Sequence, residues 1–177
     1  MSLTIDQNVT VNYIGSSSAS YGIFIQPTTS GSSTLTNKGT MNLSGTITNP
    51  IHLHGNSLTA KFDNQGKIYG TGAPANNSSG LITFQNTTCT MTNSGTINFN
   101  PTTDGTVIRA FSASAGGSFS NSGTITVGSG KALTNAIILG DSKTTFTNTG
   151  TISIGSGSII GTTGTGNAIF NLSLIHI

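Results

Sequence analysis

The sequence predicts an all-β protein built as a single-stranded parallel β-helix, also called a β-solenoid. A motif that recurs every 27–29 residues, an alternation of apolar and polar residues around it, and a composition that disfavours helices together predict this fold. Only 6% of the 177 residues are charged, glutamate and tryptophan are absent, and 24 residues are glycine. Serine, threonine and asparagine fill most polar positions and compete with helical hydrogen bonds, whereas threonine, isoleucine and phenylalanine suit a pleated sheet.

The recurring motif is Asn-x-Gly, followed by Thr or Lys and then by Ile or Met. Its five copies are residues 37–41, 64–68, 93–97, 121–125 and 148–152. Their glycines, at positions 39, 66, 95, 123 and 150, follow one another after 27, 29, 28 and 27 residues. The period predicts about 5–6 coils of 27–29 residues, in which equivalent residues of neighbouring coils form columns with a spacing of about 4.8 Å.

Apolar and polar residues alternate on both sides of each motif glycine. Four residues before it, two after it and four after it, the residues are nearly all apolar, whereas the positions between them are polar. The three apolar columns are Leu35, Phe62, Met91, Phe119 and Phe146; Met41, Ile68, Ile97, Ile125 and Ile152; and Leu43, Gly70, Phe99, Val127 and Ile154. A period of two that recurs five times in register predicts strands with one buried face.

A second apolar segment precedes each motif by a third to a half of the repeat. These segments are residues 23–25, 51–53, 81–84, 107–108 and 137–139. Glycine, serine and asparagine separate them from the motif strands and indicate turns. Each coil is therefore expected to contain at least two short strands, and two or three in all.

The motif asparagine lies on the same side of its strand as the core residues. We expect the five asparagines to form a column of stacked amides, each hydrogen-bonded to the next and satisfying backbone groups of the turn, because buried polar groups need partners. We expect the glycine two residues later to supply the positive φ of a bend between strands. Both motif residues are therefore interpreted as structural.

One repeat segment, residues 1–171, accounts for nearly the whole chain, with an irregular first coil and clear repeats over residues 34–154. Residues 172–177 read Leu-Ser-Leu-Ile-His-Ile, which is what a common transposase-end adapter encodes when read in frame, so we expect an adapter-derived tail there. No run of 18 apolar residues predicts a membrane-spanning helix. Residues 1–6 lack the basic and apolar regions of a signal peptide, so any export signal is expected outside this chain.

The four carboxylates of the chain fall in different parts of the repeat. Asp63, Asp104 and Asp141 precede the next motif glycine by three, nineteen and nine residues, and Asp6 lies outside the clear repeats. Asp104 and Asp141 stand beside glycine and serine as turn residues do. Enzymes that cleave glycans need carboxylates close together. We therefore expect no catalytic residues, no cofactor-binding residues and no enzyme activity.

His52 and His54 flank Leu53, so they share one face of a strand, the outer face if Leu53 lies in the core. Two imidazoles could hold a metal ion loosely, but no third ligand is evident, and stable sites use three or four ligands. We interpret both histidines as solvent-facing and expect no metal site. Cys89, the single cysteine, is interpreted as a small apolar strand residue.

Columns of outward-facing threonines leave one alternative open, an ice-binding surface of hydroxyl groups. Lys61, Asp63 and Lys67 interrupt these columns in one coil. The six basic residues of the chain are spread out and form no patch, so no nucleic-acid partner is expected.

The five motif copies, each preceded by Phe, Leu or Met and set in a background of Ser, Thr, Asn and Gly, resemble the β-helical passenger regions of bacterial autotransporters and filamentous haemagglutinin-like adhesins. The resemblance covers residues 8–171. It implies a non-enzymatic stalk or adhesive surface of a secreted or cell-surface bacterial protein. Its partners would be surface glycans or proteins and the neighbouring coils of a longer chain with an outer-membrane barrel. Polysaccharide lyases and hydrolases share the parallel β-helix, so a polysaccharide-active enzyme is a further alternative.

Overall fold

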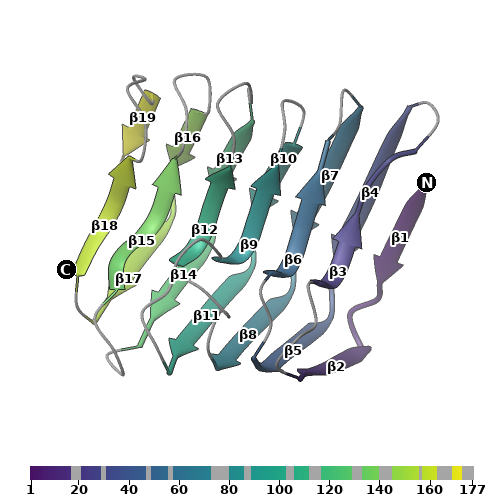
Figure 1. The fold of residues 1–177 in the computed structure, drawn as a ribbon, viewed down its shortest axis with the longest axis horizontal. Helices are drawn as coiled ribbons and strands as arrows, with labels where there is room; N and C mark the ends of the chain where they lie inside the picture. Colours follow the sequence, from purple (N-terminus) through teal and green to yellow (C-terminus); the bar gives the residue numbers. More distant parts are fainter. Residues whose placement is uncertain are drawn as a thin grey trace.

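The computed structural model describes residues 1–16, 21–28, 31–46, 49–55, 58–72, 80–85, 89–102, 106–111, 117–128, 133–139, 145–155, 157–162 and 169–172. These residues form three parallel β-sheets and no helix, and the sheets are the walls of a solenoid (Figure 1). The predicted all-β fold and parallel β-helix are confirmed.

Each coil contributes one strand to each of the three sheets. The first sheet consists of β1 (Ser2–Ile5), β4 (Ser32–Asn37), β7 (Thr59–Asn64), β10 (Cys89–Asn93), β13 (Ser118–Asn121), β16 (Thr145–Asn148) and β19 (Ile169–Leu172). The second sheet consists of β2 (Thr10–Gly15), β5 (Thr40–Gly45), β8 (Lys67–Gly72), β11 (Thr96–Pro101), β14 (Thr124–Val127) and β17 (Thr151–Ile154). The third sheet consists of β3 (Tyr21–Ile25), β6 (Asn49–His54), β9 (Gly80–Gln85), β12 (Thr106–Phe111), β15 (Leu133–Leu139) and β18 (Gly157–Thr162).

Neighbouring strands within each sheet are separated by three in chain order, and the pairing is parallel throughout. The strands therefore climb from the N-terminal end of the stack to its C-terminal end, one coil at a time (Figure 1). The sheets contain seven, six and six strands, so six coils are followed by one further strand. A coil has three strands, the upper value of the predicted two or three.

The apolar columns that the alternation predicts fill the interior between the sheets. The column of Met41, Ile68, Ile97, Ile125 and Ile152 is fully buried. In register, Ile97 lies between Ile68 and Ile125, so identical side chains stack from coil to coil. The rings of Phe119 and Phe146 stack in the same way, with centroids 5.0 Å apart. The apolar columns together thus form one continuous core along the stack.

Two small residues, Gly70 and Cys89, belong to this core. Gly70 stands at a position that is Leu43 and Phe99 in the adjacent coils. The side chains of Leu81 and Phe99 occupy the volume that a Cβ on Gly70 would need. Cys89 is fully buried and its thiol is free, which confirms its interpretation as a small apolar strand residue.

A ladder of buried asparagine side chains runs through the first sheet from β4 to β16. We call Asn37, Asn64, Asn93, Asn121 and Asn148 the asparagine ladder. Nδ2 of each amide donates to Oδ1 of the amide in the next coil, over 2.7, 2.6, 2.6 and 2.6 Å in order. Nδ2 also reaches a carbonyl of the turn, as from Asn148 to Gly150 at 3.0 Å. The predicted column of stacked amides is confirmed.

The ladder meets apolar residues at both ends. Ile5 of β1 pairs with Asn37, and Oδ1 of Asn37 is buried without a hydrogen-bond partner. Leu172 of β19 pairs with Asn148. The first residue of the expected adapter-derived tail therefore stands where the repeat has an asparagine, and residues 173–177 lie outside the described residues.

The prediction that the motif glycines supply a positive φ is wrong. Among the described glycines, positive φ occurs at Gly31, Gly45 and Gly72, which lie outside the motif. A Cβ on Gly95 would instead lie far closer than 3.0 Å to the carbonyl oxygen of Gly66, the motif glycine of the preceding coil. Glycines 66, 123 and 150 meet the same obstacle. The motif needs glycine because the backbones of stacked turns approach too closely for a side chain.

Replacing Asn93 with Leu is expected to destabilise the fold by about 2–4 kcal/mol, the effect of two impaired buried amides. Oδ1 of Asn121 loses its donor, and Nδ2 of Asn64 keeps only a 3.4 Å bond to the Thr96 carbonyl. The urea dependence of Cys89 thiol labelling measures the change, because this thiol is buried in the fold.

Two variants control for the position of the amide. Asn42→Leu breaks an exposed amide pair, 2.8 Å from Asn42 to Asn12, and should change the stability by less than about 0.5 kcal/mol. Asn37→Leu should have an intermediate effect, because Oδ1 of Asn37 already lacks a partner. Equal losses in all three variants would show that the ladder has no special role.

Replacing Gly95 with Ala is expected to lower the free energy of unfolding by at least about 3 kcal/mol, because the added Cβ would overlap the backbone of the preceding coil. Gly95→Asn distinguishes the two explanations for the glycine, because asparagine adopts positive φ readily but still carries a Cβ. We expect it to be as harmful as alanine in the same labelling assay. Gly117→Ala is the control, since the nearest atom to its Cβ is the Cys89 carbonyl oxygen at 3.1 Å. Tolerance of Gly95→Asn would restore the φ explanation.

Candidate functional site

Four ring-bearing side chains gather on the outer face of the third sheet. Tyr21 and Phe24 belong to β3 and His52 and His54 to β6, and we call these four residues the aromatic–imidazole cluster. The rings of Tyr21 and Phe24 stack with centroids 4.7 Å apart and 22° between their planes. The His52 ring lies 4.7 Å from Tyr21 and 5.4 Å from Phe24. The His54 ring lies 6.0 Å from both Phe24 and His52.

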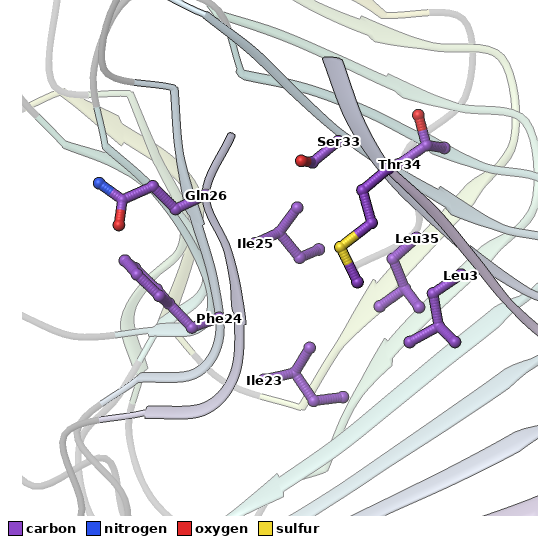
Figure 2. Close-up of a pocket in the computed structure, with 9 residues that line it drawn as sticks. Leu3, Ile23, Phe24, Ile25, Gln26, Ser33, Thr34 and Leu35 are labelled. Carbon is purple, nitrogen blue, oxygen red and sulfur yellow. The ribbon is translucent and has the colours of Figure 1, made fainter. Parts of the chain in front are cut away.

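Strand alternation places Phe24 on the outside of the solenoid. Ile23 and Ile25 point toward Leu3, while Phe24 and Gln26 project from the opposite side of the strand (Figure 2). Parallel pairing then sets Phe24 beside His52. Successive side chains of a strand point to opposite faces, so the three apolar residues 23–25 cannot all face the core of the solenoid. This run is the sequence signal for an outward aromatic residue.

The interpretation of His52 as solvent-facing is wrong. Its side chain does leave the core, but only 3% of its surface is exposed. The rings of Tyr21 and Phe24 pack against it, and Thr83, itself 2% exposed, pairs with it from β9. His54 is half-buried. The outer face of the third sheet is therefore covered at His52, which period-two alternation alone cannot reveal.

Hydrogen bonds hold this face together. Nε2 of His52 lies 2.9 Å from Oε1 of Gln85, and the hydroxyl of Thr83 donates to Oδ1 of Asn49 over 2.9 Å. An amide oxygen only accepts, so neutral His52 carries its proton on Nε2. Nδ1 is then a bare acceptor, and it is buried without a partner.

Burial keeps two titratable groups of the chain uncharged at neutral pH. It lowers the pKa of His52 from 6.5 to about 4; the hydrogen bond to Gln85 opposes this shift, and the nearby His54 adds to it. Burial also raises the pKa of the Cys89 thiol to about 11, against the effect of backbone hydrogen bonds. Thiolate is the reactive form of cysteine, so Cys89 is suited to packing.

The two histidines do not gather further metal ligands. Among the described residues, no group of three or more His, Cys, Asp or Glu side chains could hold a metal ion. Nε2 of His52 is already bonded to Gln85.

The two described carboxylates lie apart. Asp6 follows β1, whereas Asp63 lies in β7, two coils further on. Asp63 accepts hydrogen bonds of 2.5 Å from the Gln65 amide and from the Thr92 hydroxyl. Asp104 and Asp141 lie outside the described residues. Asp63 is thus held by two hydrogen bonds, and Asp6 stands two coils away from it.

Lysine side chains interrupt the threonine columns of the first two sheets. Lys67 pairs with Thr40 on one side and with Thr96 on the other, and Lys61 stands between Thr34 and Thr90. Both lysines are exposed, while these threonines are half-buried. The hydroxyl groups thus form no uninterrupted array across these coils.

A cavity of about 110 Å³ opens at the N-terminal end of the core, between β1, β3 and β4. Figure 2 shows Leu3, Leu35, Ile23 and Ile25 around it, and the polar residues that line it are Gln26, Ser33 and Thr34. Leu3 stands in the core column of Leu35 but is 54% exposed. The cavity is the uncovered end of the apolar core.

No protein-family model matches the chain, and the comparisons with curated proteins and with solved structures give no match either. The parallel β-solenoid agrees with the β-helical part of the resemblance seen in the sequence. In the part of the chain that the structure describes, no helix is long and apolar enough to cross a membrane.

Lowering the pH from about 6.5 toward 4 is expected to destabilise the fold through His52. The unfolded chain takes up a proton at His52 below its ordinary pKa of 6.5, whereas the folded chain does so only near pH 4. The stabilisation is therefore complete above about pH 6.5 and is lost as the pH falls toward 4. The midpoints of urea unfolding, followed by circular dichroism between pH 6.5 and 4, measure this loss of stability. His52→Gln should remove this part of the pH dependence and His54→Gln should keep it; an unchanged profile in His52→Gln would contradict the assignment.

Proposed function

We propose that this chain is a non-enzymatic segment of a secreted or cell-surface bacterial protein, in which the solenoid acts as a stalk and its side faces as an adhesive surface. The observation that carries the proposal is the asparagine ladder together with the continuous core. Both repeat along the stack axis, so the fold extends in one direction by adding coils. Extension along one axis is the property that a stalk needs.

The charge and composition of the outer faces support the same proposal. Serine, threonine and asparagine dominate the outward positions, and only 6% of the residues are charged. A surface of neutral hydroxyls and amides is soluble without strong long-range electrostatic steering. Such a face suits contact recognition of neutral partners, either glycans or proteins.

The enzyme alternative lacks a specific supporting observation in the described residues. A glycan-cleaving solenoid would need an acid and a base within about 10 Å of each other. Of the described carboxylates, Asp63 accepts hydrogen bonds from Gln65 and Thr92, and Asp6 follows β1, two coils away. The ice-binding alternative needs a flat hydroxyl array, and Lys61 and Lys67 break it.

Surface display tests the proposed function. The chain would be fused to an export signal and an outer-membrane anchor in a non-adhesive laboratory strain, with an epitope tag to measure the amount displayed. We expect cells that display the chain to adhere to epithelial monolayers about tenfold more than cells with the anchor alone, because many displayed copies act together. The Asn93→Leu variant, which disrupts the ladder, should lose this adhesion.

Two results would count against the proposal. One is adhesion no greater than that of the anchor alone at equal display. The other is release of reducing ends from pectin or other polysaccharides by the displayed chain, which would favour the enzyme alternative.

A further inference from the structure

We infer that His52 is an acid-sensitive switch, whose protonation opens the contact between β3 and β6 while the other coils stay stacked. The inference goes beyond the proposed function, because it requires no partner and no adhesion. It is carried by the burial of the imidazole, by the groups that surround it and by the position of β3 in its sheet.

Protonated His52 has no acceptor for its second proton. Neutral His52 already donates from Nε2 to Oε1 of Gln85 over 2.9 Å, so an added proton goes to Nδ1. Nδ1 is buried without a hydrogen-bond partner, and the whole residue is only 3% exposed. A buried donor without an acceptor destabilises the structure that contains it, and a buried charge does so more strongly. The closed contact therefore disfavours the imidazolium form.

No carboxylate in the described strands of the third sheet compensates the charge of an imidazolium here. The titratable side chains that face His52 are Tyr21 on β3 and His54 on β6, whose rings lie 4.7 and 6.0 Å away. From β9, the neutral Thr83 pairs with it. Within these strands the only Lys, Arg, Asp or Glu is Arg109, which stands in register with Thr83. Hydration is thus the way in which the charge can be stabilised, and water reaches the ring only when a covering strand moves.

The pKa of His52 sets the size of the response. Burial lowers this pKa from 6.5 to about 4, while the hydrogen bond to Gln85 opposes the shift and the nearby His54 adds to it. In the opened state water reaches the ring, so the pKa returns to its ordinary value. The opened state then binds the proton more tightly than the closed state. The equilibrium constant for opening therefore rises about twentyfold from pH 7 to pH 5, and about a hundredfold from pH 7 to pH 4.

The strand that opens is β3, because it is held on one side only. β3 is the first strand of the third sheet and pairs with β6, whereas β9 pairs with both β6 and β12. The rings of β3 that pack against His52 belong to Tyr21 and Phe24, which are 41% and 42% exposed, while Ile82 and Phe84 of β9 are buried. Opening β3 uncovers less apolar surface than opening β9, and segments with fewer buried contacts open first.

Opening exposes part of the apolar core. Ile23 and Ile25 of β3 pair with Ile51 and Leu53 of β6, and all of these except Ile23 are buried. Coils of a solenoid contact only their neighbours, so the loss of β3 leaves the pairs beyond β6 intact. Acid thus converts one end of the core into exposed apolar surface.

Hydrogen–deuterium exchange of the whole chain, followed by mass spectrometry at pH 7, 5 and 4, tests the inference. Protection is expressed relative to the intrinsic exchange rate at each pH, so that it measures the opening equilibrium. We expect the protection of the peptide that contains β3 to fall about twentyfold at pH 5 and about a hundredfold at pH 4, relative to pH 7. The peptide that contains β11, inside the second sheet, should stay far more protected at each pH.

Two variants and a titration assign the response to His52. His52→Gln keeps a polar side chain but takes up no proton, so the protection of β3 should become independent of pH. His54→Gln is the matched control on the same strand and should retain the response. In the unsubstituted chain, the Cε1 proton of His52, followed by nuclear magnetic resonance, should titrate near pH 4. This last measurement does not depend on the folding of any variant.

Three results would overturn the inference. One is equal protection of β3 and β11 at each pH, which would mean that His52 takes up its proton only when the whole fold unfolds. The others are titration of His52 near pH 6.5 in the folded chain and an acid response of β3 that survives in His52→Gln. None of these results depends on the adhesion of displayed cells, so the proposed function is tested separately.

Discussion

In-register stacking of coils is the constraint on which the rest of this structure depends. Each backbone strand bonds to its equivalent in the next coil, so every column must accept the same side-chain environment six times over. The asparagine ladder gives the buried amides of neighbouring coils hydrogen-bond partners. The motif glycines let the backbones of stacked turns approach one another closely. A substitution in either column therefore disturbs two neighbouring coils as well as its own.

Stacking also divides the residues into two classes, inward and outward, that differ in which side chains they can accept. Inward positions must fill a shared core, and Gly70 is possible there only because Leu81 and Phe99 fill its space. Outward positions carry no such demand, since the backbone hydrogen bonds already hold the coils together. In the first two sheets these positions are mainly threonine, serine and asparagine, with exposed lysines in one coil.

The third sheet departs from this pattern at its first two coils. Phe24 and Tyr21 cover His52 on the outside of the solenoid, where packing of the core does not require them. The resulting site depends on chain segments about thirty residues apart, Phe24 with His52 and His52 with Gln85, brought together by the coil period. The outward column is covered where coils lie on both sides, because His52 and Thr83 are 3% and 2% exposed, whereas Phe24, on the first strand of the sheet, is 42% exposed.

The sequence by itself determined the fold class, the coil length, the core columns and the asparagine ladder, because each repeats five times at a fixed spacing and the chemistry of a buried amide leaves few alternatives. Tertiary structure decided three matters that no single repeat contains. The motif glycines are required by the carbonyl oxygen of the preceding coil, a contact between coils rather than a local φ. The division of each motif region at its glycine into two strands of different sheets, such as β4 and β5, appears only when the strands are paired across coils. His52 is buried although it points outward, because Tyr21 and Phe24 of the preceding coil lie over it, and their positions depend on register rather than on alternation.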